Sequence, residues 1–469
     1  MIYRREDVGQ LEFSCPHDEV AEERLVLTID GFVEHLDLGF LRARYSEAGT
    51  GFYDPGMMLK VWFFAYCDGS WHCREVAKRV RYDVRYRYFV GSHRPDFRTL
   101  NRFRKAHLDL LPDYFAQLVS YCERLGLIDS SVVALDGTKL RANASGRRRA
   151  KDSLRQEINR RLAHDVQADD LEGEVEVGDG AVAEEAVSAT DPAARLMKTG
   201  EGTVRLCYNA QVVVDNQQLI VAAAVSNEAD DRSLLSPLLE QAESQLSAEL
   251  GAIVADGGYY SGRNMKYAQE RGLDVYIPKG LNERGVFGQE QFAYDQANDR
   301  YRCPNGQRLK RGRQRERNGV AKTTYLGSVK QCRGCPLKSA CTKDRYRRLE
   351  VAETHVYEQT LAAKLATPQG QAIYARRREL VEPVFGNLKF NFGFTRFSLR
   401  GLAQVRGEFL LLCIAHNLKK LARWWGHRQL QAAFLTALES ITVRLDHSLT
   451  RFGAFLHSRK KIKLASSGI

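Results

Sequence analysis

The stretch VVALDGTK, residues 132–139, carries one carboxylate, Asp136, inside a short run of apolar and β-branched residues. A second stretch, IVADGGY at residues 253–259, places Asp256 at the end of a similar run. An ionised carboxylate is costly to bury unless a cation neutralises it. We therefore expect two strands of one sheet, whose acids meet at the sheet edge and hold a positive charge.

A third acid, Glu382, lies farther along the chain in RELVEPVFGNLK, residues 378–389. Arg378 precedes Glu382 by four residues and Lys389 follows it by seven, so the three can share one face of a helix that covers the sheet. This pattern pairs an acid for a metal ion with two bases for phosphate.

Each acid also has a plainer interpretation. The sequences DG at 136–137 and DGG at 256–258 are typical of turns. Pro383 disfavours the helical conformation for Glu382, so the helix is expected either to kink there or to begin close by. Glu379 is the competing acid. The joint appearance of three acids in this order favours a shared site.

The three acids together predict a divalent-metal site. Mg²⁺ prefers hard oxygen ligands such as carboxylates. Two Mg²⁺ ions roughly 4 Å apart would clamp the attacking and leaving oxygens of a phosphodiester. We therefore predict that Asp136, Asp256 and Glu382 are the catalytic residues and metal ligands of a phosphoryl-transfer enzyme.

Composition narrows the class of protein. The chain has 469 residues, a length that corresponds to about three domains. Hydrophobic residues make up 44% of it, which is enough for each domain to form a hydrophobic core. Its net charge of +12 favours nucleic acid as a partner, because Lys and Arg release counterions from phosphates. A basic protein without such a partner is the alternative. The amino terminus lacks a signal peptide's apolar stretch, and the longest apolar block, residues 409–415, is too short for a membrane span, so we expect a cytoplasmic protein.

The first part of the chain, residues 17–125, has a helical pattern with a break at residues 91–95. The helix that restarts after the break places Arg98, Arg102 and Lys105 on one face. Two helices with a tight break and a basic second face fit a helix-turn-helix-like DNA-binding unit. An ordinary helical bundle with a solvated basic face fits equally well, and the sequence leaves both open.

From residue 131 the pattern changes to strands. Residues 208–225 predict a hairpin around a polar turn, followed by a helix from Arg232 to about Gly251 and a buried strand at 252–255. This order predicts an α/β fold with a mixed sheet covered by helices.

Two inserted segments differ from this core in composition. Residues 165–191 are acidic and poor in aromatics, which indicates a solvated tract in a mobile insertion, and its acids are not counted as ligands. A second segment, residues 291–352, is strongly basic. Because its basic residues far outnumber its acidic ones, its positive side chains would repel one another without a counterion. We therefore expect the segment to lie along DNA through residues that include Arg311, Arg313 and Arg315.

The basic segment also holds four of the ten cysteines, in the order Cys303, Cys332, Cys335 and Cys341. Four thiolates, two of them in a Cys-x2-Cys pair, can make a tetrahedral structural zinc site. The segment has few large apolar residues with which to fold otherwise, which favours zinc. Unliganded thiols are the alternative.

These blocks resemble those of the DDE transposases of bacterial insertion sequences, over roughly residues 52–423. LDGTK at 135–139 is similar to the first catalytic block of that family, and VADGGY at 254–259 is similar to the second. The third block resembles the signature Tyr-x2-Arg-x3-Glu-x6-Lys, whose last three positions are occupied here by Arg378, Glu382 and Lys389. Ala375 stands in the slot of the tyrosine, and Tyr374 lies one place early.

The resemblance implies a ribonuclease-H-like mixed sheet flanked by helices, with a helical N-terminal domain and a cysteine-containing basic insertion. It implies that two Mg²⁺ ions act at Asp136, Asp256 and Glu382, and that Arg378 and Lys389 contact DNA phosphate. It also implies double-stranded DNA as partner, as element ends and as target, and a homodimer that pairs two ends.

The implied activity is cutting at the element's ends and joining of the freed 3′-hydroxyls to target DNA. A related endonuclease without strand transfer and a catalytically inactive DNA-binding protein derived from a transposase are the alternatives. The expected domains are a helical DNA-binding domain (1–125), the first part of the catalytic core (126–290, with a mobile insertion at 145–200), the basic insertion (291–352), the second part of the core (353–430) and a C-terminal tail (431–469).

Overall fold

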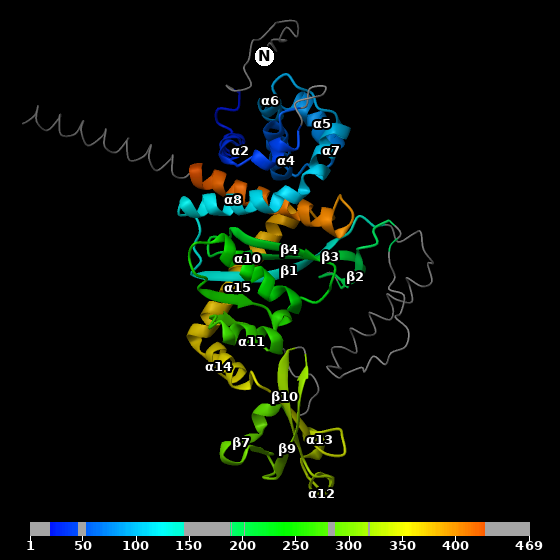
Figure 1. Ribbon diagram of the computed structural model, residues 1–469, viewed down its shortest axis with the longest axis vertical. Helices are drawn as coiled ribbons and strands as arrows, with labels where there is room; N and C mark the ends of the chain where they lie inside the picture. The colour runs from blue at the N-terminus through cyan, green and yellow to red at the C-terminus, as the bar shows by residue number, and fades with distance from the viewer. Residues whose placement is uncertain are drawn as a thin grey trace, which may run out of the picture.

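The computed structural model describes residues 19–45, 53–144, 188, 190–200, 202–279, 287–317 and 319–426. The predictions for the start of the N-terminal domain, most of the acidic insertion and the C-terminal tail lie outside these ranges. Along the longest axis, N-terminal helices are followed by a central sheet with its covering helices and then by a second, smaller sheet (Figure 1).

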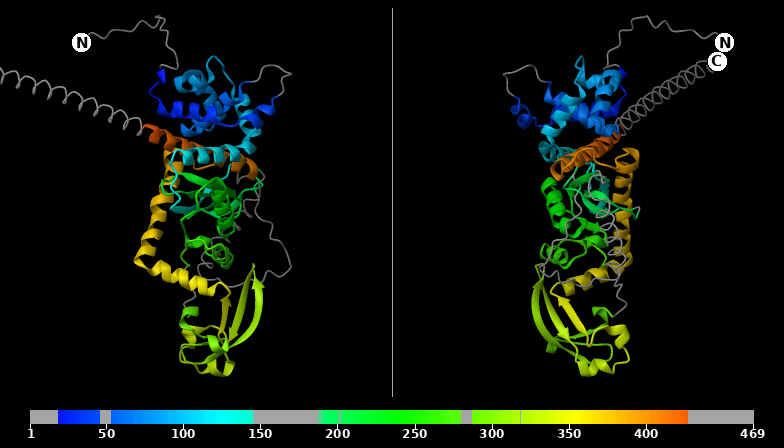
Figure 2. Two further views of the ribbon diagram at one scale, coloured as in Figure 1. Left: turned by 60° about the vertical axis from the view of Figure 1, so that its left-hand side comes forward. Right: turned by 90° about the vertical axis from the view of Figure 1, so that its right-hand side faces the viewer.

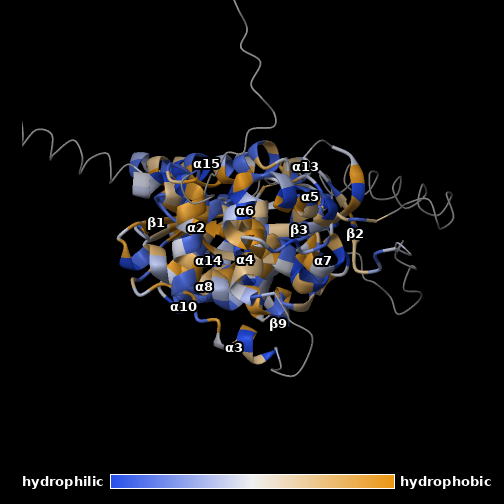
Figure 3. Cartoon of the chain, turned by 90° about the horizontal axis from the view of Figure 1, so that it is seen from above, coloured by the Kyte–Doolittle hydropathy of each residue, from blue (hydrophilic) through white to orange (hydrophobic). Residues whose placement is uncertain are grey.

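The N-terminal helices pack around α4 (Pro55–Cys67), in which every residue except Pro55 and Lys60 is buried. Asp54 caps this helix by accepting a hydrogen bond from the Met57 amide. The other helices are α2 (Arg24–His35), α3 (Gly39–Ala43), α5 (Cys73–Tyr82), α6 (Val84–Val90), α7 (Phe97–Ala106), η1 (Leu108–Leu110) and α8 (Leu111–Arg124). Seen from above, α4 occupies the middle of this group (Figure 3). The helix predicted to restart after residues 91–95 is α7.

The central sheet consists of β1 (Val132–Arg141), β2 (Arg195–Lys198), β3 (Val204–Val214), β4 (Ile220–Ser226), β5 (Ala252–Ala255) and β6 (Val275–Tyr276). Its order is β2–β3–β1–β5–β6, and β4 also pairs with β3. Strands β1, β3 and β4 are antiparallel neighbours, whereas β5 and β6 continue the sheet in parallel with β1. This is the ribonuclease-H-like arrangement, so the predicted fold class is confirmed, together with the hairpin of β3 and β4.

Helices cover the sheet, and one of them is shorter than predicted. The helix expected from Arg232 to about Gly251 is a single turn, η3 (Arg232–Leu234), followed by α10 (Leu235–Gln245). It ends because Leu246 adopts an extended conformation, after which the Ser247 amide donates to Glu123 on α8 at 2.8 Å. Two further elements follow β5, namely η4 (Gly257–Tyr259) and α11 (Gly262–Glu270).

The end of the acidic insertion is not solvated, in contrast to the prediction. Asp191 is fully buried, where it accepts hydrogen bonds from the Tyr208 hydroxyl at 2.7 Å and the Gly401 amide at 3.1 Å. Strand β2 then adds to the sheet edge within residues 145–200, the range expected for the mobile insertion. A buried carboxylate needs such donors, and composition alone does not reveal them.

The basic segment forms an antiparallel sheet of its own, with the order β11–β10–β9–β8–β7. Its small core includes Phe292, Tyr301, Leu309, Tyr325 and Leu349. The elements are η5 (Gln289–Gln291), β7 (Ala293–Asp295), η6 (Gln296–Asn298), β8 (Arg300–Arg302), β9 (Arg308–Arg317), β10 (Val320–Leu326), α12 (Val329–Arg333), α13 (Lys338–Cys341) and β11 (Arg348–Ala352). Two views show this sheet projecting away from the core below α11 (Figure 2).

Two consecutive helices lead back from the basic sheet to the core. α14 (His355–Ala366) begins three residues after β11 ends, and α15 (Pro368–Gly386) carries Glu382. The expectation of a helix start near Glu382 is wrong, because Pro383 lies inside α15 close to its C-terminal end. The helix continues into a π-helical turn, η7 (Asn387–Asn391).

The last described helix, residues 402–426, lies between the N-terminal helices and the sheet (Figures 1 and 2). Glu408 on this helix is fully buried. It accepts hydrogen bonds from the backbone amides of Ser398 and Leu399 at 3.0 and 2.9 Å, from the Ser398 hydroxyl, and from the Tyr66 hydroxyl at 3.3 Å. The helix approaches η1 so closely that a Cβ at Gly407 would overlap the Leu108 side chain. It therefore joins the N-terminal helices to the central sheet.

Candidate active site

The pairing of β1 with β5 positions the first two acids. The two strands are parallel, and Leu135 pairs with Ala255. The next residues along each strand are Asp136 and Asp256, so the two carboxylates come from equivalent positions on neighbouring strands. The interpretation of Asp136–Gly137 as a turn is therefore wrong, because both residues lie within β1, where Gly137 pairs with Gln211.

Helix α15 lies against β1 and β5 and brings the third acid to the same place. The contact is made through Arg377, which the sequence analysis did not single out. One guanidinium nitrogen of Arg377 lies 2.7 Å from a carboxylate oxygen of Asp136, and another lies 3.7 Å from Glu382. The side chains of Arg377 and Asp136 are 15% and 19% exposed, whereas that of Glu382 is 56% exposed.

The charges of these groups act on one another. Burial raises the pKa of Asp136 to about 6; the Gly137 amide and Arg377 oppose this rise, and the carboxylate of Asp256 adds to it. Burial acts to lower the pKa of Arg377, but Asp136, Tyr374, Asp256 and Glu382 together raise it above its ordinary value. One guanidinium thus lies within the field of all three acids.

A hydrogen-bonded network supports this site from the side of β3. Asp231 accepts hydrogen bonds from Lys139 at 3.0 Å, from Asn209 at 2.6 Å and from Gln211 at 2.7 Å. Gln211 also accepts from the Tyr259 hydroxyl. Asn209 and Gln211 are fully buried and point the same way along β3 because side chains alternate in a strand.

Gly137 is required by this network, since a Cβ there would overlap the Gln211 side-chain nitrogen. Buried amide side chains two residues apart, in an otherwise apolar strand, are a signal that was present in the sequence. Asp231 carries no comparable signal, because it lies in a loop whose position only the fold fixes.

The residues predicted to bind DNA lie on several parts of the surface. Arg378 is exposed and Lys389 is half-buried. The arginine that contacts the acids is Arg377 instead of Arg378. The predicted basic face of α7 is exposed at Arg98, Arg102 and Lys105. On β9 the side chains of Arg311, Arg313 and Arg315 are exposed, and Arg311 forms an ion pair with Asp299 at 2.9 Å.

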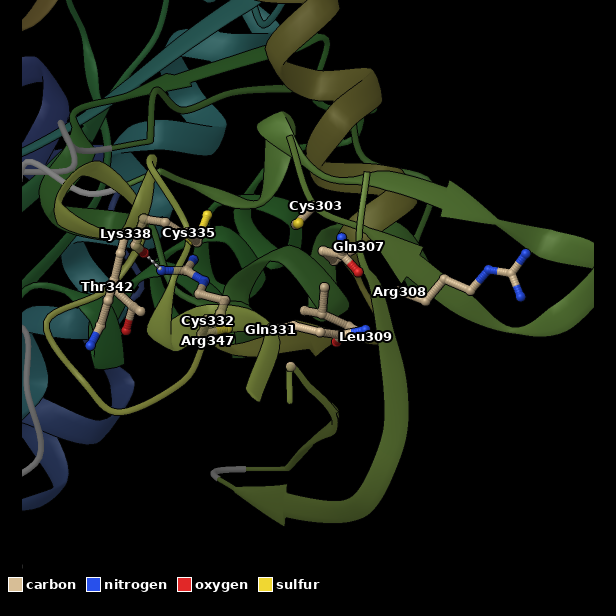
Figure 4. Close-up of a pocket in the computed structure, with 12 residues that line it drawn as sticks. Cys303, Gln307, Arg308, Leu309, Gln331, Cys332, Cys335, Lys338, Thr342 and Arg347 are labelled. Carbon is tan, nitrogen blue, oxygen red and sulfur yellow. Dashed lines mark hydrogen bonds between the residues drawn. The ribbon is translucent and has the colours of Figure 1, made fainter. Parts of the chain in front are cut away.

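The four clustered cysteines line one cavity of about 30 Å³ in the basic sheet. Figure 4 shows Cys303, Cys332 and Cys335 around it, with Arg347 close by. Burial raises the pKa of Cys341, which is also the one buried thiol of the four, and the other three thiols add to that rise. Arg347 donates hydrogen bonds to the carbonyls of Cys341 and Phe287, both at 2.8 Å.

A metal site is not preformed in the described ranges, where no three side chains of His, Cys, Asp or Glu are grouped closely enough to hold an ion. The chemistry of the acid cluster nevertheless fits a hard divalent cation. Its donors are carboxylate oxygens, and Arg377 already lies among them as a positively charged stand-in.

Comparison with known families agrees with this arrangement. A family model described as a transposase DDE domain matches residues 302–422, and one described as a transposase domain (DUF772) matches residues 15–106. No curated protein matches the chain. The class that the fold and the two matches support is the DDE transposases, and within it the chain is similar to those of insertion-sequence type. Glu382 lies inside a matched range, whereas Asp136 and Asp256 lie between the two.

These matches support a transposase that processes nucleic acid, with DNA as its partner. Among the described helices, none is long and apolar enough to cross a membrane.

Proposed function

We propose that this protein is a DNA transposase that cuts the ends of its element and joins the 3′-hydroxyls to target DNA by two-metal in-line phosphoryl transfer. The observation that supports the proposal is that Arg377 lies 2.7 Å from Asp136 and 3.7 Å from Glu382, while Asp256 follows the residue that pairs with Leu135, next to Asp136. Both reaction steps are displacements at phosphorus, so one set of carboxylates serves both.

In this proposal Asp136, Asp256 and Glu382 hold two Mg²⁺ ions, which when bound activate the attacking oxygen and neutralise charge on the leaving oxygen. The chain's own groups position the DNA. Arg378 and Lys389 contact phosphates near the reacting strand. The exposed basic residues of α7 and β9 hold the duplex on either side of the core, Arg98, Arg102 and Lys105 at one end and Arg311, Arg313 and Arg315 at the other.

Strand joining is the test that separates this function from its alternatives. A labelled duplex from the DNA that flanks the coding region, cut to expose a 3′-hydroxyl, is incubated with the protein, Mg²⁺ and a supercoiled plasmid. We expect covalent joining of the duplex to the plasmid. We also propose that the protein acts as a homodimer bound to the DNA of the nucleoid. Native gels of the same reactions should then show complexes that contain two duplexes and two chains.

Two outcomes would contradict the proposal. Cleavage of uncut ends without any joining would identify an endonuclease. Salt-sensitive binding without cleavage, under Mg²⁺ or Mn²⁺, would identify an inactive DNA-binding protein.

We also propose that Cys303, Cys332, Cys335 and Cys341 bind a structural Zn²⁺ ion in the basic sheet. All four line one cavity, and the sheet has a core of only a few apolar side chains. Binding would require the thiols to draw together, with the zinc supplying folding energy that this small core does not.

Chelator-washed protein should retain about one equivalent of zinc per chain, because a four-thiolate site binds tightly. Replacing both Cys332 and Cys335 with serine should remove the metal, whereas Cys73→Ser, in α5, should not. The measurement is elemental analysis of the purified variants. Less than about half an equivalent in the unmodified chain would count against the site.

A further inference from the structure

The guanidinium of Arg377 occupies a position that a metal ion at the three acids would need. It lies 2.7 Å from Asp136 and 3.7 Å from Glu382, and Asp256 follows the β5 residue that pairs with the residue before Asp136. A divalent cation bound to the same oxygens would lie against this guanidinium. Two cations at such a distance repel each other strongly in a partly buried site.

Neither neighbouring arginine is placed to do the same. Arg376 donates to Asn216 and forms an ion pair with Glu379 at 3.2 Å. Arg378 is exposed on the surface of α15. Lys139, the other nearby cation, is held by Asp231 at 3.0 Å. Among these four cations, Arg377 alone forms ion pairs with the proposed metal ligands.

Burial makes the pairing of Arg377 and Asp136 mutually dependent. Both side chains are less than one-fifth exposed, so each charge would be poorly solvated without the other. Arg377 can leave only if another cation replaces it at Asp136 and another anion receives it. A DNA phosphate is suited to the second role, because guanidinium groups bind phosphate in a bidentate manner.

We propose that Arg377 is a counter-ion gate: it competes with divalent metal for the three acids, and DNA phosphate releases it, so that DNA and metal bind cooperatively. The inference rests on the proposed function, since it takes Asp136, Asp256 and Glu382 as the metal ligands. Its consequence is that the free protein binds divalent metal weakly, and that the metal ions needed for cleavage bind mainly once DNA is in place.

Mn²⁺ binding, measured by calorimetry or by loss of the free-ion EPR signal, tests the gate without any reaction. Without DNA, Arg377→Gln should bind Mn²⁺ on the order of tenfold more tightly than the unmodified chain, a typical size for coupling between two sites. Arg377→Lys keeps the charge and should stay close to the unmodified chain. Arg263→Gln, which removes an exposed charge from α11, is the control and should have no effect.

Adding a short duplex of arbitrary sequence should tighten Mn²⁺ binding to the unmodified chain and leave Arg377→Gln nearly unchanged. If Arg377→Gln instead binds Mn²⁺ equally or more weakly while its melting temperature is retained, Arg377 is a structural support for the acids and the gate is overturned. If Arg377→Gln fails to fold, the proposal can still be tested with the unmodified chain and with Arg377→Lys. If DNA does not tighten Mn²⁺ binding to the unmodified chain, the gate is rejected.

Asp136→Asn separates this inference from the proposed function. Loss of Mn²⁺ binding in Asp136→Asn, with no gain in Arg377→Gln, would reject the gate alone. Equal Mn²⁺ binding in Asp136→Asn and the unmodified chain, with DNA present, would reject the three acids as ligands and the gate with them.

Discussion

Replacing Asp136 or Asp256 with asparagine, or Glu382 with glutamine, should lower the rate of strand cleavage on the order of a thousandfold or more. The reason is that each change removes an anionic ligand from a site whose catalytic effect is the stabilisation of charge on phosphorus oxygens. The fold should survive. An asparagine at 136 can still accept the hydrogen bond that the Gly137 amide donates to Asp136 at 2.7 Å, and Glu382 is more than half exposed.

The matched control is Glu379→Gln. Glu379 lies on α15 three residues before Glu382, is 68% exposed, and forms its ion pair with Arg376 instead of Arg377. We expect this variant to cleave at close to the unmodified rate. The measurement is a gel assay on a labelled duplex from the DNA flanking the coding region, with Mg²⁺. Normal cleavage by all three acid variants would end the proposed mechanism, and loss of cleavage in Glu379→Gln would show that the third acid has been misassigned.

Replacing Glu408 with leucine should lower the free energy of unfolding by about 3 to 5 kcal/mol, the range for leaving partners of a buried carboxylate unpaired. Glu408 is fully buried and accepts two backbone amides and two hydroxyls. Leucine fills similar space and accepts none of them. Glu408→Gln keeps an acceptor oxygen and should cost less than half as much.

Urea unfolding followed by tryptophan fluorescence is a direct measurement, because Trp62 and Trp71 lie in the unit that Glu408 anchors. The control is Glu240→Leu on the exposed face of α10, which should change stability by less than about 0.5 kcal/mol. An equal effect of the two substitutions would show that the Glu408 contacts contribute little to stability.

The succession of β1, β3, β4 and β5 along the chain was predictable because each of these strands carries its own pattern, whereas β2 and β6 were not predicted. β5 was predicted at residues 252–255 because four apolar residues precede Asp256. The register that places Asp136 beside Asp256 could not be derived from either segment alone, since it depends on which residues of the two strands pair. The three acids as one set therefore stay a prediction from the sequence, and their relative positions could not be predicted from it.

Arg377 and the basic sheet escaped prediction for different physical reasons. The spacing of four residues from Arg378 to Glu382 suggested a shared helical face, but a long arginine side chain can reach a partner five residues away, as Arg377 does. The ten residues of β9, RLKRGRQRER, have almost no apolar alternation. The sheet forms because a thin core, which includes Leu309 and Tyr325, covers one side of it.

The contact between Glu408 and Tyr66 joins residues that are 342 positions apart, and Cys67 donates to the Ala415 carbonyl over a similar span. At about 5 to 20 residues per second, a ribosome needs on the order of 20 to 70 seconds to synthesise the chain between these partners. During that interval the nascent α4, nearly all of whose residues are buried in the finished protein, lacks its last covering helix. The helix at residues 402–426 is thus synthesised long after α4, and we expect a chain that ends before residue 402 to aggregate more readily than the full chain.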